Sequence, residues 1–121
     1  VGGIIGYNNY GVIENVFVRN VNVGQCREAV LRINLQYENR ENCQRGYTPT
    51  VRNVHLKNVN CQKSELGILI IGLDDDTLVN NISVEDCRWN NVSKGKNQID
   101  GATNIVLDNL YINDKIVNEK H

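Results

Sequence analysis

The chain repeats one nine-residue pattern four times. The copies begin at residues 15, 53, 81 and 104, so that successive starts are separated by 38, 28 and 23 residues. In each copy Asn comes first, aliphatic residues stand second and fourth, Asn or Asp stands sixth, and apolar residues stand seventh and ninth. Self-similarity at spacings of a few tens of residues is typical of proteins built from stacked repeats.

The spacing inside each copy predicts strands rather than helices. Apolar residues alternate in steps of two, which places them on one face of an extended chain, whereas an amphipathic helix needs steps of three and four. The alternation changes phase at the sixth position, so we expect each copy to form two short strands that meet at a bend. Asn and Asp tolerate the left-handed backbone angles of such a bend. Repeated Asn side chains can also stack as a hydrogen-bonded ladder.

These patterns predict an all-β chain that forms one domain over residues 1–121. Val, Ile and Leu occupy the inward positions, as suits a pleated and buried surface. We interpret the repeats as about four coils of a single-stranded parallel β-helix, a type of solenoid. The alternative is an antiparallel sandwich in which the repeated pattern is a coincidence.

A second strand is expected in each coil. Residues Ala29–Asn34 alternate so that Leu31 and Ile33 face the core while Arg32 and Asn34 point to solvent. Residues 67–72 occupy the corresponding place in the next coil, and residues 94–100 do so in the third with weaker apolar character.

The expected register follows from counting residues. Leu31 and Leu69 each lie eight residues after the last position of the preceding copy, so we expect them to pair. This register places Arg32 beside Ile70 and Asn34 beside Gly72. Gly72 would then leave a flat spot next to Asn34, where a sugar ring could lie against the backbone.

Composition excludes some partners and suggests how the chain ends. The net charge is −1 with 22% charged residues, so we expect no nucleic-acid partner and no membrane surface. No apolar run reaches the roughly 18 residues that span a bilayer. The chain begins at Val1 without a capping segment, so we expect it to be the C-terminal piece of a longer β-helix, with residues 114–121 as a polar partial cap. The open first coil predicts self-association.

The cysteines do not form a metal-binding pattern. Cys61 and Cys87 take inward positions and are expected to be buried free thiols. Cys26 and Cys43 lie in the loops around the second strand and could bridge in an oxidising compartment. Their spacing does not suggest zinc, and we expect no metal and no cofactor.

A few polar residues could carry chemistry. Arg32 offers a rigid donor fork that matches a carboxylate, although a solvated surface arginine is the alternative. Residues 74–76 are three consecutive aspartates, which could serve sugar hydrolysis or hold a cation, but a solvated turn is favoured. Tyr37 lies in the long irregular stretch 35–50 and could stack on a sugar. His55 is expected at the surface, with no Ser or Cys placed against it.

The repeat pattern, the strand Ala29–Asn34 and two shorter segments resemble glycoside hydrolase family 28, the polygalacturonases and related pectin-degrading enzymes. The repeat pattern followed by Ala29–Asn34 is similar to the C-terminal half of that family, and Arg32-Ile33-Asn34 resembles its Arg-Ile-Lys motif. The start of the chain at Val1-Gly2-Gly3 and the segment Gly72-Leu73-Asp74-Asp75 also resemble stretches found in the family.

The resemblance implies a right-handed parallel β-helix that acts on galacturonate-containing pectin by inverting hydrolysis, outside the cell or in the periplasm. In the family, the arginine and lysine of the motif contact a galacturonate carboxylate. The predicted substrate-binding residues are Arg32, Asn34, Tyr37, Gly72 and Asp74, of which Arg32 and Asn34 occupy the positions of this motif. Asn34 replaces the family's lysine, which removes one positive charge. The motifs that carry the catalytic carboxylates and histidine would lie before Val1, so no catalytic residue is assigned and the chain itself is expected to be inactive. The alternative function is a non-catalytic β-solenoid for polysaccharide binding or assembly.

Overall fold

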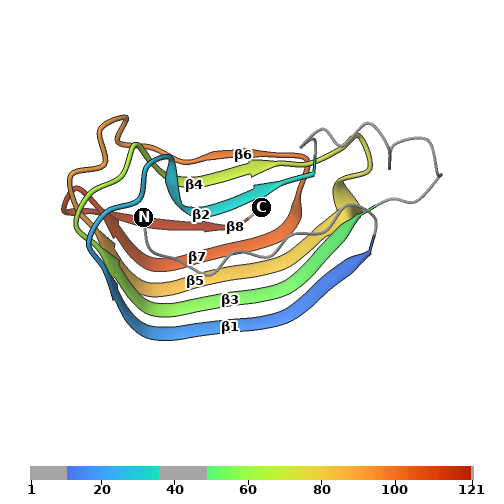
Figure 1. Ribbon diagram of the computed structural model, residues 1–121, viewed down its shortest axis with the longest axis horizontal. Coiled ribbons are helices and arrows are strands. Elements are labelled where there is room, and N and C mark those ends of the chain that lie inside the picture. The colour runs from blue at the N-terminus through green and yellow to red at the C-terminus, as the bar shows by residue number, and fades with distance from the viewer. Residues whose placement is uncertain (1–10, 36–48, 121) are drawn as a thin grey trace.

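The computed structural model describes residues 11–35 and 49–120, and these form two sheets that lie as two layers (Figure 1). The larger sheet has the order β1-β3-β5-β7-β8, and the smaller has the order β2-β4-β6. The larger sheet consists of β1 (Val12–Val23), β3 (Thr50–Cys61), β5 (Val79–Trp89), β7 (Thr103–Ile112) and β8 (Lys115–Lys120). The smaller consists of β2 (Ala29–Asn34), β4 (Leu66–Ile71) and β6 (Gln98–Asp100). The chain therefore alternates between the two sheets from β1 to β7.

The four copies of the sequence pattern stack in register. Their second residues are direct partners along the sheet, with Val16 opposite Val54, Val54 opposite Ile82, and Ile82 opposite Ile105. All of these pairs are parallel. The prediction of an all-β chain whose repeats lie side by side in parallel is therefore confirmed.

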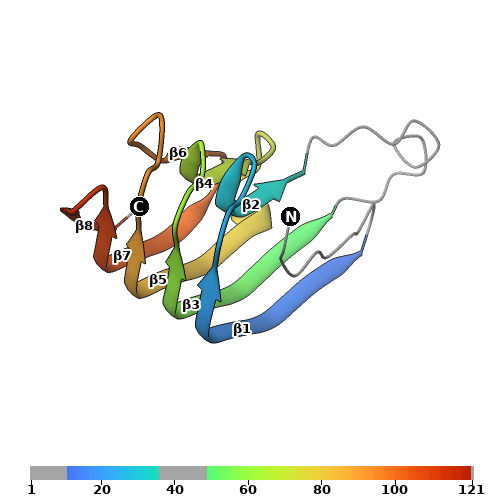
Figure 2. The same cartoon turned by 60° about the vertical axis from the view of Figure 1, so that its left-hand side comes forward.

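Each copy lies in one continuous strand, and not in two separate strands as the sequence suggested. The first and sixth residues of every copy have positive φ, between 51° and 60°. These residues are Asn15, Asn20, Asn53, Asn58, Asn81, Asp86, Asn104 and Asn109. Ladder pairing between β1 and β3 skips each left-handed residue and resumes after it. Each strand thus bends without ending, as the strands in Figure 2 do near their C-terminal ends.

Alternate side chains of the strands fill the space between the sheets. Ile68, Ile70, Ile82 and Ile105 are fully buried, as are many of their neighbours in the same core. Trp89, the ninth residue of the third copy, is also fully buried, and its indole Nε1 donates to the carbonyl oxygen of Val59 at 3.0 Å. The partner satisfies the indole N–H, which would otherwise carry a desolvation cost.

The register between the strands of the smaller sheet differs by one residue from the expectation. Arg32 lies opposite Leu69, and Asn34 lies opposite Ile71. The predicted partners, Ile70 for Arg32 and Gly72 for Asn34, are therefore wrong. The cause is the length of the preceding turn. Val23 pairs with Cys61 and Ala29 with Leu66, so the first turn is one residue longer than the second. The predicted register requires the turn before β2 and the turn before β4 to have the same length.

The segment around β6 and the C-terminus are less regular. Of residues 94–100 only the last three form a strand, β6, because the chain turns at residues 92–95, where the N–H of Gly95 donates to the carbonyl oxygen of Val92 at 2.9 Å and Gly95 has a φ of +60°. Residues 115–120 form β8, which pairs antiparallel with β7 and thereby covers the edge of that strand. The polar tail thus caps the sheet as a hairpin strand.

Candidate functional site

The outer face of the smaller sheet carries two predicted binding residues in neighbouring rows. One row is Arg32, Leu69 and Gln98, and the next is Asn34, Ile71 and Asp100. These residues point away from the core because the residues that alternate with them on β2 and β4, Ile33, Ile68 and Ile70, are buried. Leu69 and Ile71 are only half-buried. The face is therefore an apolar strip on β4 with polar side chains on both flanks.

The guanidinium of Arg32 is held in place by an ion pair. Its Nε lies 2.8 Å from Oε2 of Glu28, and the two side chains are 44% and 51% exposed. An exposed pair of this kind contributes little to stability. It does orient the arginine, however, and the guanidinium still has four further N–H donors on its two Nη atoms. Arg32 can therefore meet a carboxylate while Glu28 holds its Nε.

The opposite flank of the face is acidic. The amide Nε2 of Gln98 donates to Oδ2 of Asp100 at 3.3 Å, and both side chains are exposed. Since one strand separates β2 from β6, the two flanks are about 10 Å apart. An acidic ligand would be repelled by Asp100 on the β6 flank, whereas on the β2 flank the charges of Arg32 and Glu28 offset each other.

The remaining predicted binding residues are not gathered at this face. Tyr37 lies outside the described residues. Asp74 is exposed in the segment that follows β4. Gly72 is buried, and a Cβ placed on it would lie 2.0 Å from the carbonyl oxygen of Gly101. The flat spot expected beside Asn34 is therefore a close contact between the backbones of two glycines, and the roles of these residues in binding stay predictions.

The three aspartates at residues 74–76 form an exposed turn. Asp75 caps the short 3-10 helix η1 (Asp76–Leu78), because its Oδ1 accepts hydrogen bonds from both the hydroxyl and the backbone N–H of Thr77. The hydroxyl contact, followed by the backbone contact, lowers the pKa of Asp75. The favoured interpretation of this run as a solvated turn is confirmed.

His55 corrects another expectation. Its Nδ1 lies 2.6 Å from Oγ of Ser83. The prediction that no Ser or Cys lies against His55 is therefore wrong. Both residues stand third in their copies and are paired in the sheet, so their contact is a direct result of the register. On the other side the imidazole stacks on Phe17 at a centroid distance of 5.3 Å. Within the described ranges, no carboxylate is bonded to this ring to complete a nucleophile–base–acid set.

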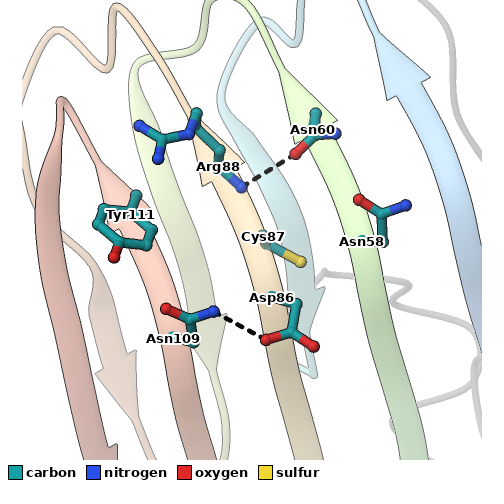
Figure 3. Close-up of a pocket in the computed structure, with 7 residues that line it drawn as sticks. All are labelled: Asn58, Asn60, Asp86, Cys87, Arg88, Asn109 and Tyr111. Carbon is teal, nitrogen blue, oxygen red and sulfur yellow. Dashed lines mark hydrogen bonds between the residues drawn. The ribbon is translucent and has the colours of Figure 1, made fainter.

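Figure 3 shows a polar hollow on the larger sheet that sequence reasoning missed. Its volume is about 340 Å³. The lining residues are Asn58, Asn60, Asp86, Cys87, Arg88, Asn109 and Tyr111, from β3, β5 and β7. The sequence does contain a signal for it. Three of these residues, Asn60, Arg88 and Tyr111, stand eighth in their copies and are direct neighbours along the sheet.

Hydrogen bonds and one cation–π contact hold the side chains of the hollow. Oδ1 of Asn60 accepts from the backbone N–H of Arg88 at 3.1 Å, and Nδ2 of Asn109 donates to Oδ1 of Asp86 at 2.9 Å. The guanidinium carbon of Arg88 lies 4.4 Å from the centre of the Tyr111 ring. These amides and the aromatic ring offer hydrogen bonds and a flat surface to a neutral polar ligand.

The thiols are arranged partly as expected. Cys61 and Cys87 are buried and reduced, which confirms their assignment to the core, while Cys43 lies outside the described residues. Burial raises the pKa of Cys87 above its ordinary value, so this thiol is a poor nucleophile at neutral pH. Among the described residues, no group of three or more His, Cys, Asp or Glu side chains is placed to hold a metal ion.

No helix within residues 11–35 and 49–120 has the length and apolarity needed to cross a membrane. Comparison of the sequence and structure with protein-family models, curated proteins and solved structures gives no match.

Proposed function

We propose that the chain forms the coils of a right-handed parallel β-helix and belongs to a polygalacturonase-like glycoside hydrolase that acts on pectin. Two observations support the fold. The strands alternate between two mainly parallel sheets, and equivalent residues of the four copies lie opposite one another. The resemblance of Arg32-Ile33-Asn34 to the family motif supports the substrate class.

The observation that carries the proposal is the position of Arg32 beside the apolar strip on β4. A galacturonate unit has an anionic carboxylate and a ring face made of C–H groups. Arg32 offers charged donors at an exposed position, and Leu69 and Ile71 offer half-buried apolar surface next to it. Ligand sites commonly combine apolar surface with a few placed polar groups. One sugar unit would therefore lie over β4 with its carboxylate toward β2.

The chemical step is assigned to residues outside this chain. Inverting glycosidases use two carboxyl groups far enough apart to admit a water molecule between them and the sugar. The family's motifs for these carboxylates are not found in the 121 residues. We therefore expect the chain to bind polygalacturonate but to release no reducing sugar from it. The compartment proposed for the parent enzyme is extracellular or periplasmic, where pectin is met.

Arg32→Ala tests the role of the arginine, and Arg52→Ala is a matched control. Arg52 on β3 is also exposed and ion-paired, with its Nε 2.6 Å from Oε2 of Glu14. A charge-assisted hydrogen bond contributes about 1.5–3 kcal/mol. Arg32→Ala should therefore weaken oligogalacturonate binding by roughly tenfold or more in calorimetric titration, while Arg52→Ala should leave it nearly unchanged. Equal losses in both variants would mean that only overall charge matters, and no loss for Arg32→Ala would reject its role.

The hollow on the larger sheet favours a second candidate function, a non-catalytic solenoid that binds neutral glycan. Its amides and the Tyr111 ring are suited to hydroxyl groups and a sugar face. Tyr111→Ala would then weaken binding of a neutral polysaccharide, whereas Arg32→Ala would not. The variants Tyr111→Ala and Arg32→Ala therefore distinguish the two candidate functions.

A further inference from the structure

Two cysteines that are 35 residues apart in the sequence bring their sulfur atoms into contact. Cys26 lies in the turn between β1 and β2, and Cys61 is the last residue of β3. Their Sγ atoms are 3.9 Å apart. The turn is also fixed to the following coil by backbone hydrogen bonds, because the N–H of Cys26 donates to the carbonyl of Lys63 at 2.9 Å. The contact thus belongs to a fixed part of the fold.

We propose that Cys26 and Cys61 form a disulfide under oxidising conditions, which joins the turn of the first coil to the second coil. The sequence had suggested Cys43 as the partner of Cys26. The pairing with Cys61 rests on the position of the turn over the end of β3, which only the register of the coils reveals.

The geometry allows the two sulfurs to close to bonding distance. A disulfide needs an S–S separation of about 2.05 Å, so the sulfurs must approach each other by roughly 2 Å. The backbone of Cys26 can stay in place during this movement, because its partly exposed side chain can rotate about χ1 toward Cys61. Cys26 is partly exposed and Cys61 is only 1% exposed. Cys26 is therefore the residue that an external reagent meets first.

The oxidant is a low-molecular-weight disulfide, written RSSR, that reacts by thiol–disulfide exchange. The thiolate of Cys26 attacks one sulfur of RSSR, which forms a mixed disulfide and releases one RSH. The sulfur of Cys61 then attacks Sγ of Cys26, which forms the internal disulfide and releases the second RSH. The two protein thiols lose two electrons and two protons in total, and RSSR takes them up.

The surroundings of Cys26 make the first step slow without a base. Burial, and then the neighbouring Cys61, raise the pKa of the Cys26 thiol to about 11. The reactive thiolate is therefore scarce at neutral pH. A mildly alkaline buffer is the appropriate condition for the reaction in the test tube.

The test is to oxidise the folded chain with oxidised glutathione and to map the linked peptides by mass spectrometry without reduction. The variants Cys26→Ser, Cys43→Ser and Cys87→Ser are treated in parallel. A peptide that links Cys26 to Cys61 is expected in the unaltered chain, in Cys43→Ser and in Cys87→Ser. A link between Cys26 and Cys43, or unreacted Cys26 and Cys61 thiols, would overturn the proposal.

Thermal unfolding supplies an independent measurement. Closing a loop of this length restricts the unfolded chain, so oxidation should raise Tm by an amount on the order of 10 °C. The rise should persist in Cys43→Ser and disappear in Cys26→Ser, whose substitution lies in a turn rather than in the core. Linked peptides without any rise in Tm would contradict the stabilising role of the bond.

Discussion

Asparagine and aspartate at the bends allow each strand to turn without leaving the sheet. All eight first and sixth positions of the copies are Asn or Asp with positive φ, a conformation that costs other L-residues about 1–2 kcal/mol. Their side chains also form hydrogen bonds between neighbouring copies, as when Nδ2 of Asn58 donates to Oδ1 of Asn20 at 2.8 Å. The bends and the ladder were predictable from the sequence because both depend on residue type at a fixed position.

Variants at Asn58 separate the two contributions of such a residue. Asn58→Ala removes the amide and puts a residue with a Cβ at a φ of +53°, so it should lower the free energy of unfolding by about 1–2 kcal/mol. Asn58→Gly removes the same amide but adopts positive φ freely, so its loss should be smaller. Urea unfolding of both variants measures the difference. Equal losses would mean that the ladder, and not the backbone, determines the choice of Asn.

Contacts between side chains from different repeats were harder to predict. The hydrogen bond of His55 to Ser83 and the contact of Cys26 with Cys61 depend on which residues become neighbours across the sheet. The contact of His55 with Ser83 could have been predicted, because both residues stand third in their copies. In the contact of Cys26 with Cys61, one partner lies in a turn, where the repeat pattern gives no register.

At the scale of elements, the bounds of strands were easier to predict than the register between them, because the register depends on the lengths of the turns. The strand Ala29–Asn34 was predicted with its bounds and its buried face, because alternation alone fixes them. Its partner was misplaced by one residue, because the turn before β2 is longer than the turn before β4. The polar hollow was missed because each copy was interpreted for its inward residues, whereas all the residues that line the hollow except Cys87 are bend or outward residues of three strands.

The contact between Gly72 and Gly101 fixes the chain after β4 against the chain after β6. A Cβ on Gly72 would lie 2.0 Å from a backbone oxygen that cannot rotate away, so Gly72→Ala should lower the free energy of unfolding by about 3 kcal/mol. Gly24→Ala is the matched control, since no atom lies within 4 Å of its added Cβ. Urea denaturation compares the two. A mild effect of Gly72→Ala, similar to that of Gly24→Ala, would show that the two segments separate easily.

At the scale of the whole molecule, the inward side chains of β1 are less covered than their partners on β3. Val16 and Val18 are only half-buried, whereas their partners Val54 and Leu56 on β3 are 6% and 4% exposed. Among the described strands, β1 is the last of the larger sheet on that side. Unpaired strand edges next to apolar surface promote pairing with other chains.

We therefore expect the protein to self-associate through β1 as its concentration rises. Val18→Lys places a charge at the inward face of this strand and should shift the chain toward the monomer. Phe17→Lys is a control on the outer face, where Phe17 is 58% exposed and stacked on His55. Sedimentation velocity over a range of concentrations measures the effect. A monomer at all concentrations, or equal effects of both variants, would contradict association through the edge of β1.

The proposed recognition of a galacturonate carboxylate is tested most directly by comparing two polymers with the same backbone. One is polygalacturonate, and the other is its fully methyl-esterified form, in which the carboxylates are masked as neutral esters. If Arg32 binds a carboxylate beside the apolar strip on β4, calorimetry should give at least roughly tenfold tighter binding of the acidic polymer, without release of reducing sugar. Equal binding of both polymers, or cleavage of either, would contradict the account.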